Sequence, residues 1–342
     1  MKIFHCILSG GNSERLWPVT GKDRPKQFSE LISSPPLFVK TYQRLLSIAA
    51  PEDIFILSNK KHVEIALDLM PQLSRDRFII EPSSKDTMAA IALAAHTLYN
   101  IENDALMFIY PSDHVISDED SFTKVMSRAS KFIFDNGGPL VFGIQPTGPN
   151  TSFGYIEYNN SSNDKNVHPV TRFIEKPKSN IARDMIDKGN FLWNSGIYGW
   201  KLSSIIKDID IHAPEIAKSV KDVINKKNID AWHSIDPISI DYSLIEKLQN
   251  ISVIKVDFGW TDLGTWGSYY DISEKDCNMN TLIGDASSVN SKRNLIISND
   301  RSTAVYGIED LIVIHYKDKT LIAPRSKSNE IKKLIRDGAL DT

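Results

Sequence analysis

A glycine turn and two cations stand close together near the start of the chain. Gly10 and Gly11 follow an apolar run over residues 3–8, and Arg15 and Lys26 come shortly afterwards. Glycine lacks a Cβ atom, so its backbone can turn sharply and bring N–H groups close to a ligand. Arginine and lysine supply the positive charge that a polyphosphate attracts. Together these residues suggest nucleotide chemistry, although a strand followed by two glycines is also a common plain turn in α/β proteins.

The spacing of this turn disfavours two familiar classes of nucleotide-binding protein. Ser13 and Arg15 stand where the dinucleotide fingerprint G-x-G-x-x-G needs glycines, and the P-loop pattern G-x-x-x-x-G-K-[ST] does not occur. We therefore expect neither a dinucleotide oxidoreductase nor a P-loop ATPase.

Two aspartates could hold a metal ion. Asp113 comes just after an apolar run over residues 105–110, and Asp262 lies in a loop bracketed by Trp260 and Trp266. Carboxylates from two loops could share one Mg²⁺ with the phosphate oxygens of a nucleotide. For each aspartate alone, a turn or a helix N-cap is about as good an interpretation.

An acid and a base stand side by side at the end of another apolar run. Glu175 and Lys176 follow residues 170–174, and in an extended chain their side chains would point to opposite faces. Glu175 could then contact a sugar hydroxyl and Lys176 a phosphate. Asn194 adds an amide suited to sugar hydroxyls. A surface ion pair and a bulged strand are the competing interpretations.

Composition disfavours several other functions. The 342-residue chain has a formal net charge of −3, which shows no basic excess for nucleic acid. Its only cysteines, Cys6 and Cys277, do not form a disulfide framework, and its histidines show no zinc spacing. The opening apolar run is too short for a signal peptide, and no run approaches a membrane span of about 20 residues. We expect a cytoplasmic protein that binds neither nucleic acid nor membranes.

Apolar runs alternate with segments of helical period and predict the elements that position these residues. The expected strands are 3–8, 54–57, 78–80, 105–110, 140–144, 153–158, 170–174, 191–200 (broken at 194–196) and 251–256. The expected helices are 38–49, 87–99 with a cap at Asp86 or Thr87, 214–225 and 243–248. This rhythm is typical of a Rossmann-like α/β fold whose mixed, mostly parallel sheet is flanked by helices, with ligands at the carboxyl ends of the strands.

The pattern of apolar runs changes near residue 280. Short β-rich runs over 294–298, 303–306, 311–315 and 320–323 are separated by turn residues, and a helix over 328–336 follows. They predict a small β-rich, β-helix-like appendage. We expect domains at 1–275 and 280–342. The appendage could cover a sheet edge or mediate a homodimer.

Several segments, in this order, make the chain resemble the sugar-1-phosphate nucleotidyltransferases, and within them the bacterial mannose-1-phosphate guanylyltransferases (GDP-mannose pyrophosphorylases). They are Leu8-Ser9-Gly10-Gly11, Arg15-Leu16-Trp17-Pro18, Pro25-Lys26-Gln27-Phe28, the run 81–87, Pro111-Ser112-Asp113-His114, Gly154-Tyr155-Ile156, Phe173-Ile174-Glu175-Lys176-Pro177, Trp193-Asn194-Ser195-Gly196 and the run 260–266. The resemblance covers residues 1 to about 270 and, more loosely, the β-rich tail. It implies a GT-A-like domain that uses GTP and α-D-mannose 1-phosphate to make GDP-mannose and pyrophosphate.

The resemblance also implies roles for matching residues. Those that would bind the nucleotide are Ser9, Gly10, Gly11, Arg15, Lys26, Lys85, Asp86 and Thr87, with Lys26 at the α-phosphate and residues 85–87 near guanine. Those that would bind the sugar phosphate are Gly154, Glu175, Asn194 and, on the phosphate, Lys176. Asp113 and Asp262 would hold Mg²⁺ and, with Arg15 and Lys26, would form the catalytic set.

Alternatives and departures accompany this resemblance. The sugar could be glucose or a manno-heptose, or the chain could be a non-catalytic sugar-nucleotide sensor, which the presence of the whole catalytic set disfavours. Ser13 stands where the family usually has glycine, and could restrict the loop. Bacterial relatives often carry a further isomerase domain, and since this sequence ends at Thr342 we expect no isomerase activity.

Overall fold

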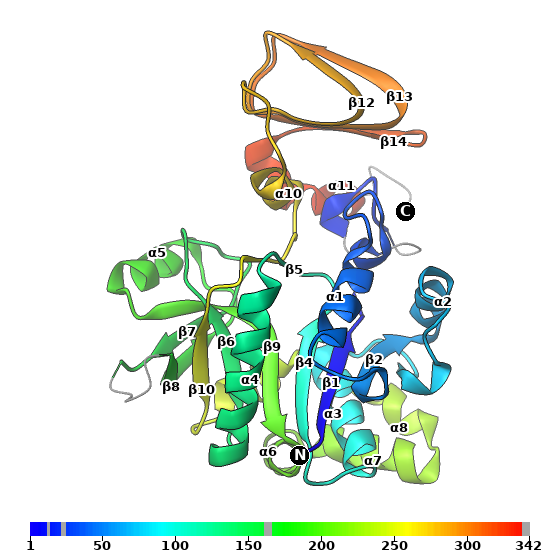
Figure 1. Ribbon diagram of the computed structural model, residues 1–342, viewed down its shortest axis with the longest axis vertical. Helices are drawn as coiled ribbons and strands as arrows, with labels where there is room; N and C mark the ends of the chain where they lie inside the picture. The colour runs from blue at the N-terminus through cyan, green and yellow to red at the C-terminus, as the bar shows by residue number, and fades with distance from the viewer. Residues whose placement is uncertain (12–13, 22–24, 161–165, 337–342) are drawn as a thin grey trace. The chain divides into compact units, whose positions relative to one another are not determined.

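The computed structural model describes residues 1–11, 14–21, 25–160 and 166–336 (Figure 1). By packing, the chain divides into two compact units. The first unit holds residues 1–10, 39–112 and 116–260, and the second unit holds residues 11–38, 113–115 and 261–342. The domain boundary expected near residue 280 stays a prediction.

A mixed sheet forms the centre of the first unit. Over the described residues it has nine strands in the order β3-β2-β1-β4-β9-β6-β10-β8-β7. Their bounds are β1 Ile3–Leu8, β2 Ile54–Asn59, β3 Phe78–Glu81, β4 Leu106–Pro111, β6 Leu140–Ile144, β7 Tyr155–Tyr158, β8 Val167–Ile174, β9 Phe191–Lys201 and β10 Ser252–Val256. β1 to β4 pair in parallel, and β9 enters antiparallel between β4 and β6. The predicted α/β fold with a mixed sheet is confirmed.

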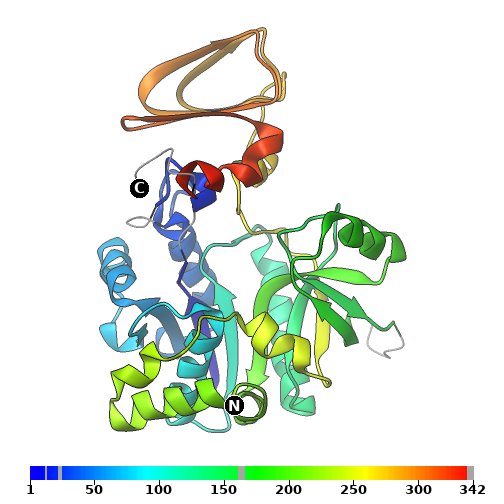
Figure 2. The same ribbon diagram turned by 180° about the vertical axis from the view of Figure 1, so that it is seen from behind.

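Helices cover both faces of this sheet. They are α1 Leu37–Leu46, α2 Lys60–Leu69, α3 Asp86–Tyr99, α4 Glu119–Asn136, α5 Ser179–Lys188, α6 Leu202–His212, α7 Pro214–Lys226, α8 Ile229–His233 and α9 Ile240–Ser243. Successive residues of a strand point to opposite faces. Met107 and Ile109 of β4 therefore join the core with α3, whereas Tyr110 packs its ring 6.1 Å from that of Phe122 on α4. Figure 1 shows α4 in front of the sheet, and Figure 2, from behind, shows α7 and α8 in front.

Two expectations about local structure need correction. The helix expected over residues 243–248 is instead α9 followed by a short 3-10 turn at Ile245–Lys247, because Ser239 caps the chain earlier. The strand expected to break at 194–196 runs through as β9, but its pairing with β6 shifts register there. The irregularity that the Asn-Ser-Gly run predicts is therefore a bulge.

The second unit carries a β-helix-like stack. Its strands are β12 Thr281–Val289, β13 Leu295–Tyr306, β14 Leu311–Tyr316 and β15 Lys319–Pro324, and its helices include α10 Trp266–Ile272 and α11 Lys332–Arg336; the short strands β5 Val115–Ile116 and β11 Trp260–Thr261 complete the elements. β12, β13 and β14 stack in parallel, and β15 returns antiparallel. The runs expected separately at 294–298 and 303–306 form one strand, and the helix expected over 328–336 is a 3-10 turn at Arg325–Glu330 followed by α11.

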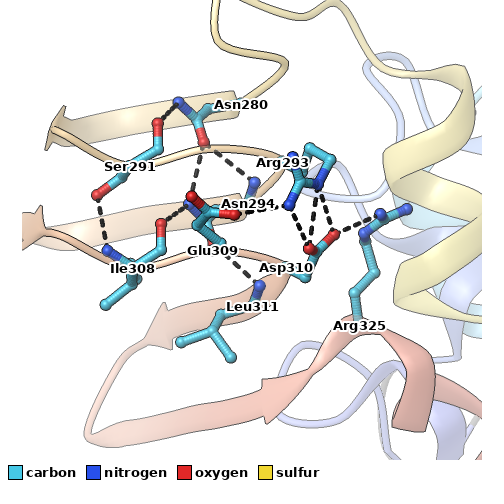
Figure 3. Close-up of polar contacts among 9 residues, drawn as sticks. All are labelled: Asn280, Ser291, Arg293, Asn294, Ile308, Glu309, Asp310, Leu311 and Arg325. Carbon is cyan, nitrogen blue, oxygen red and sulfur yellow. Dashed lines mark hydrogen bonds and ion pairs between the residues drawn. The ribbon is translucent and has the colours of Figure 1, made fainter.

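Buried asparagines connect successive layers of this stack (Figure 3). The Nδ2 group of Asn294 donates to Asn280 Oδ1 and to the carbonyl of Ile308, both at 3.0 Å, and its Oδ1 accepts from the N–H of Leu311 at 2.9 Å. Asn280 Nδ2 donates to the carbonyl of Ser291 at 2.9 Å. These bonds give hydrogen-bond partners to backbone N–H and carbonyl groups of the turns. Without them, burial would leave those groups unpaired.

An ion-pair group lies beside the asparagines (Figure 3). Arg293 donates from Nε to both oxygens of the Asp310 carboxylate and from Nη2 to Oδ2, and Arg325 donates a fourth bond at 2.9 Å. These bonds lower the pKa of Asp310 to about 2. The carboxylate is nearly half exposed, so we expect it to orient the turns more than to add stability.

No helix among the described residues combines the length and the apolar character needed to cross a membrane.

Candidate active site

Three predicted catalytic residues meet in the second unit. Lys26 lies in a 3-10 turn at Lys26–Phe28 and is only 5% exposed. Its Nζ forms an ion pair with Asp113 Oδ2 at 3.0 Å. It also donates to the backbone carbonyls of Asp262 and Leu263. Segments separated by more than two hundred residues therefore converge on one buried ammonium group.

The two aspartates lie in turns and cap no helix. Asp118 is the N-cap of α4, and Thr265 is the N-cap of α10 through a capping box with Ser268. Asp262 Oδ1 instead accepts from the N–H of Gly264 at 3.1 Å. The N-cap interpretation of Asp113 and Asp262 is thus wrong, whereas the turn interpretation agrees with their positions.

The charge on Asp113 is favoured by its neighbours. Burial alone would raise its pKa, but the Lys26 ammonium and the His114 ring outweigh burial and hold the pKa of Asp113 below its usual value. The side chain is 31% exposed and can be reached from solvent. Asp113 is therefore an anion at neutral pH.

The donor set fits magnesium bound jointly with a substrate. Mg²⁺ prefers oxygen ligands and often takes only one or two carboxylates, the rest coming from water and phosphate. Asp113 and Asp262 offer such carboxylates. Among the described residues, no group of three or more His, Cys, Asp or Glu side chains could hold an ion by itself. An ion here would depend on phosphate oxygens for the remainder of its shell.

Hydrogen bonds to the backbone of Ser9 fix the start of the glycine turn after β1. In the first unit, the N–H of Ser9 donates to the carbonyl of Leu57 at 2.9 Å. The carbonyl of Ser9 accepts from Ser58 Oγ and from His62 Nδ1, each at 3.2 Å. The His62 side chain on α2 thus fixes the start of the turn, which the sequence did not indicate.

Gly11 and Arg15 continue this turn in the second unit. Gly11 has a φ of 91°, a conformation that favours glycine, and an added Cβ would meet no described atom within 4 Å. Arg15 is half-buried, and within the described part of the chain its guanidinium has no ion pair. Ser13 lies outside the described residues.

The segment predicted near guanine is largely engaged in packing. Lys85 donates to two backbone carbonyls of residues 233–235, at 2.8 and 2.6 Å, and Thr87 Oγ1 accepts from the N–H of Ile240 at 2.9 Å. Lys85, not Asp86 or Thr87, takes the N-cap position of α3, so the expected cap is wrong. Asp86 is exposed with a φ of 64°. The nucleotide-binding role of these residues stays a prediction.

The predicted sugar residues are neighbours in the first unit. The N–H of Asn194 donates to the carbonyl of Gly154 at 2.8 Å. A Cβ added at Gly154 would lie 2.4 Å from Glu175 Oε2 and 3.3 Å from Asn194 Cβ. Any larger residue at position 154 would therefore require the Glu175 carboxylate to move.

Glu175 and Lys176 do not point to opposite faces as predicted. β8 ends at Ile174, and Lys176 has a φ of 47°, so the chain is no longer extended. The Lys176 ammonium forms an ion pair with Glu175 Oε1. Burial would lower the pKa of Lys176, but Glu175 raises it by more, so the cation is retained. The ion-pair interpretation is the one the structure supports.

Two residues that the sequence did not single out complete this group. Tyr198 OH donates to Asp241 Oδ1 at 2.5 Å, and Asn194 Nδ2 donates to both Tyr198 OH, at 2.9 Å, and Asp241 Oδ1, at 3.2 Å. Burial and, next, the Glu175 carboxylate raise the pKa of Asp241 to about 7. Asp241 stands in a short polar run with no motif spacing, so no local signal could have identified it.

The tryptophans beside the predicted site serve chiefly as core. Trp17, Trp193 and Trp266 are buried, as the packing interpretation predicted. Trp260 is half-buried, with its ring edge-on to Phe153 at 5.3 Å.

Two family models match successive parts of this chain. The family model described as nucleotidyl transferase matches residues 5–279, and the one described as MannoseP isomerase/GMP-like beta-helix domain matches residues 284–337. A mannose-1-phosphate guanylyltransferase of Sinorhizobium fredii is 33% identical, covering 99% of this chain and 68% of the relative. One of Escherichia coli is 30% identical, covering 96% and 74%.

A solved structure shares the fold. A protein described as a mannose-1-phosphate geranyltransferase from Thermus thermophilus matches with a TM-score of 0.89 at 24% identity, covering 99% of this chain and 100% of that one. The chain belongs to the nucleotidyl transferase family, with a MannoseP isomerase/GMP-like beta-helix domain after it. The family resemblance and the predicted β-helix-like appendage are confirmed.

Proposed function

We propose that this chain transfers GMP from GTP to α-D-mannose 1-phosphate, giving GDP-mannose and pyrophosphate. The observation that carries the proposal is the buried Lys26 ammonium between Asp113 and the Asp262 loop, in a chain of the nucleotidyl transferase family. The names of the relatives support GTP and mannose 1-phosphate as the substrates. We propose that it acts in the cytoplasm, where both substrates are available.

The reaction needs little covalent chemistry from the protein. An oxygen of the sugar phosphate, already anionic, attacks the α-phosphorus of GTP. A new P–O bond forms, the bond to the β-phosphate breaks, and pyrophosphate leaves with the electron pair. The chief requirement is that two anions are aligned and their charge offset. Neither a protein nucleophile nor a strong base is required.

The residues divide this work between them. Lys26 would offset the charge that develops at the α-phosphate, and the glycine turn with Arg15 would hold the triphosphate. Asp113 and Asp262 would hold Mg²⁺, which when bound neutralises phosphate charge. Gly154, Glu175 and Asn194 would bind mannose, Lys176 its phosphate, and residues 85–87 would lie near guanine.

Pyrophosphate release tests the proposal. We expect release from the purified full chain with GTP, Mg²⁺ and mannose 1-phosphate, and none when the sugar phosphate is omitted. Replacing GTP by ATP, UTP, CTP or dTTP tests the base, and replacing mannose 1-phosphate by glucose or manno-heptose 1-phosphate tests the sugar.

Metal removal provides the internal control of the same assay. Chelation by EDTA should stop pyrophosphate release, because two carboxylates would then face the triphosphate with no ion between them, and excess Mg²⁺ should restore it. If no pair of nucleotide and sugar phosphate gives pyrophosphate, the proposed function is wrong. The chain would then be better described as a non-catalytic sugar-nucleotide sensor.

Gly154→Ala should damage use of the sugar phosphate selectively. The new Cβ would push against the Glu175 carboxylate, which its Lys176 partner holds in place. We expect the KM for mannose 1-phosphate to rise at least about tenfold, as for the loss of one charged hydrogen bond, with the KM for GTP unchanged. Gly148→Ala is the matched control, since its Cβ would meet nothing within 4 Å. Equal KM values in both variants would contradict the role of Gly154.

A further inference from the structure

One oxygen of Asp241 has no hydrogen-bond partner among the other residues that the structure describes. Asp241 lies in α9, and its Oδ1 accepts the bonds from Tyr198 OH and Asn194 Nδ2. Its Oδ2 accepts none from any other described residue. The side chain is therefore held in place at Oδ1, whereas Oδ2 accepts no hydrogen bond from another described residue. The backbone N–H of Asp241 itself also stabilises the carboxylate.

The neighbouring Asn194 has little left to offer a ligand. An amide has two N–H donors, and both are taken, one by Tyr198 OH and one by Asp241 Oδ1. Its Oδ1 already accepts from the N–H of Gly196 at 3.0 Å. Only one lone pair of Asn194 remains. Among the described residues, Asn194 thus orients Asp241 through one donor and keeps one acceptor lone pair for the mannose that it would bind.

The charges of the group indicate which part of a sugar phosphate Asp241 would meet. The Glu175 carboxylate lies close enough to Asp241 to raise the pKa of Asp241, after burial, and a phosphate would be repelled by this pair of acids. Lys176 supplies the opposite charge, and half of its side chain is exposed. The carboxylate side therefore suits neutral hydroxyl donors, and the Lys176 side suits the anion.

We propose that Asp241 is a sugar-binding residue that accepts a hydrogen bond from a hexose hydroxyl through Oδ2, and that it thereby selects among sugar 1-phosphates. The proposal rests on the proposed function of the same site. At a pH above the raised pKa of Asp241, where the side chain is ionised, a hydroxyl bonded to it forms a strong, charge-assisted bond, and the assays below are run there. A sugar that lacks or inverts that hydroxyl leaves the carboxylate oxygen unpaired, so it binds less well.

Asp241→Asn is the most informative variant because its hydrogen-bond partners fix the orientation of the new amide group. Tyr198 OH and Asn194 Nδ2 are both donors, so the asparagine oxygen must face them. Its NH₂ group then occupies the position of Oδ2 and offers a donor where the hydroxyl needs an acceptor. We expect the KM for mannose 1-phosphate to rise about ten- to hundredfold, with the KM for GTP within about twofold.

Asp208→Asn is the matched control. Asp208 lies on α6, and burial raises its pKa as well, but it contacts none of the sugar group. Its variant should keep both KM values. Circular dichroism and thermal unfolding of each variant will show that the fold is retained.

A cycle with deoxy sugars identifies the bond itself. The 2-, 3-, 4- and 6-deoxy analogues of mannose 1-phosphate are compared in the wild type and in Asp241→Asn. For one of the analogues, kcat/KM with the wild type should be about tenfold or more lower than for mannose 1-phosphate. With Asp241→Asn, the same analogue and mannose 1-phosphate should have nearly equal kcat/KM values. Equal losses in both proteins for every analogue would overturn the proposal.

The two proposals can fail separately. If the wild type releases no pyrophosphate, the proposed function fails, and binding of mannose 1-phosphate is then measured by calorimetry. Weaker binding to Asp241→Asn than to the wild type would still support the sugar-binding role. Equal binding, or none to either protein, would overturn it.

Discussion

Replacing Lys26 by methionine is expected to lower the kcat of GMP transfer about 10²- to 10³-fold, a loss of about 3 to 4 kcal/mol of transition-state stabilisation. Methionine keeps most of the buried stem, so the core around the 5% exposed side chain should survive. What is lost is the ammonium that contacts Asp113 and the Asp262 loop. The measurement is pyrophosphate release at saturating GTP and mannose 1-phosphate.

The control for this variant is an exposed lysine. Lys207→Met on α6 removes the same charge away from the Lys26 group and should keep kcat. Thermal unfolding must show that Lys26→Met remains folded. A folded Lys26→Met protein with kcat within about threefold of the wild type would show that this ammonium does not offset charge in the reaction.

Trp266→Ala should produce the largest loss of stability. Trp266 is fully buried in the second unit, with Leu16 and Leu263 in the same core, and its Nε1 donates to the carbonyl of Trp17 at 2.9 Å. Removing a buried tryptophan costs about 3 to 5 kcal/mol, a large part of the stability of an ordinary domain. Because Leu16 adjoins Arg15 and Leu263 adjoins Asp262, activity should fall as well. Urea unfolding followed by circular dichroism measures the first effect, and pyrophosphate release the second.

Trp232→Ala provides a matched comparison. Trp232 is also fully buried, and its Nε1 donates to the carbonyl of Ser83 at 2.8 Å, but it lies in the first unit. We expect a similar loss of stability with a smaller effect on kcat in the protein that remains folded. If Trp266→Ala unfolds with the wild-type midpoint, its ring does not support the second-unit core.

The strands and most helices were accessible from the sequence because their signals are local. β1, β4 and β6 were predicted to within a residue, since buried strands are continuous apolar runs between turn residues. β13 was expected as two strands. Polar residues interrupt its apolar pattern, and it is the parallel pairing with β12 on both sides of a register shift that makes it one strand.

Site residues were accessible where their type alone suggested chemistry. Lys26, Asp113 and Asp262 each stand in a distinctive segment, and the structure brings them together. Lys176 was misplaced because its left-handed φ depends on where β8 ends, which no local pattern states. Asp241 was missed because its partners lie 43 and 47 residues away in the sequence, on β9.

The sequence by itself determined the α/β architecture, the family and the segments that carry charge, because hydrophobic period and residue type are local properties. The tertiary structure alone decided which charges meet. The Lys26 ammonium contacts two distant turns, and the Asn194 amide donates to both Tyr198 and Asp241. Hydrogen bonds and ion pairs act over a few ångströms in space, whatever the separation along the chain, so only the folded backbone could pair these groups.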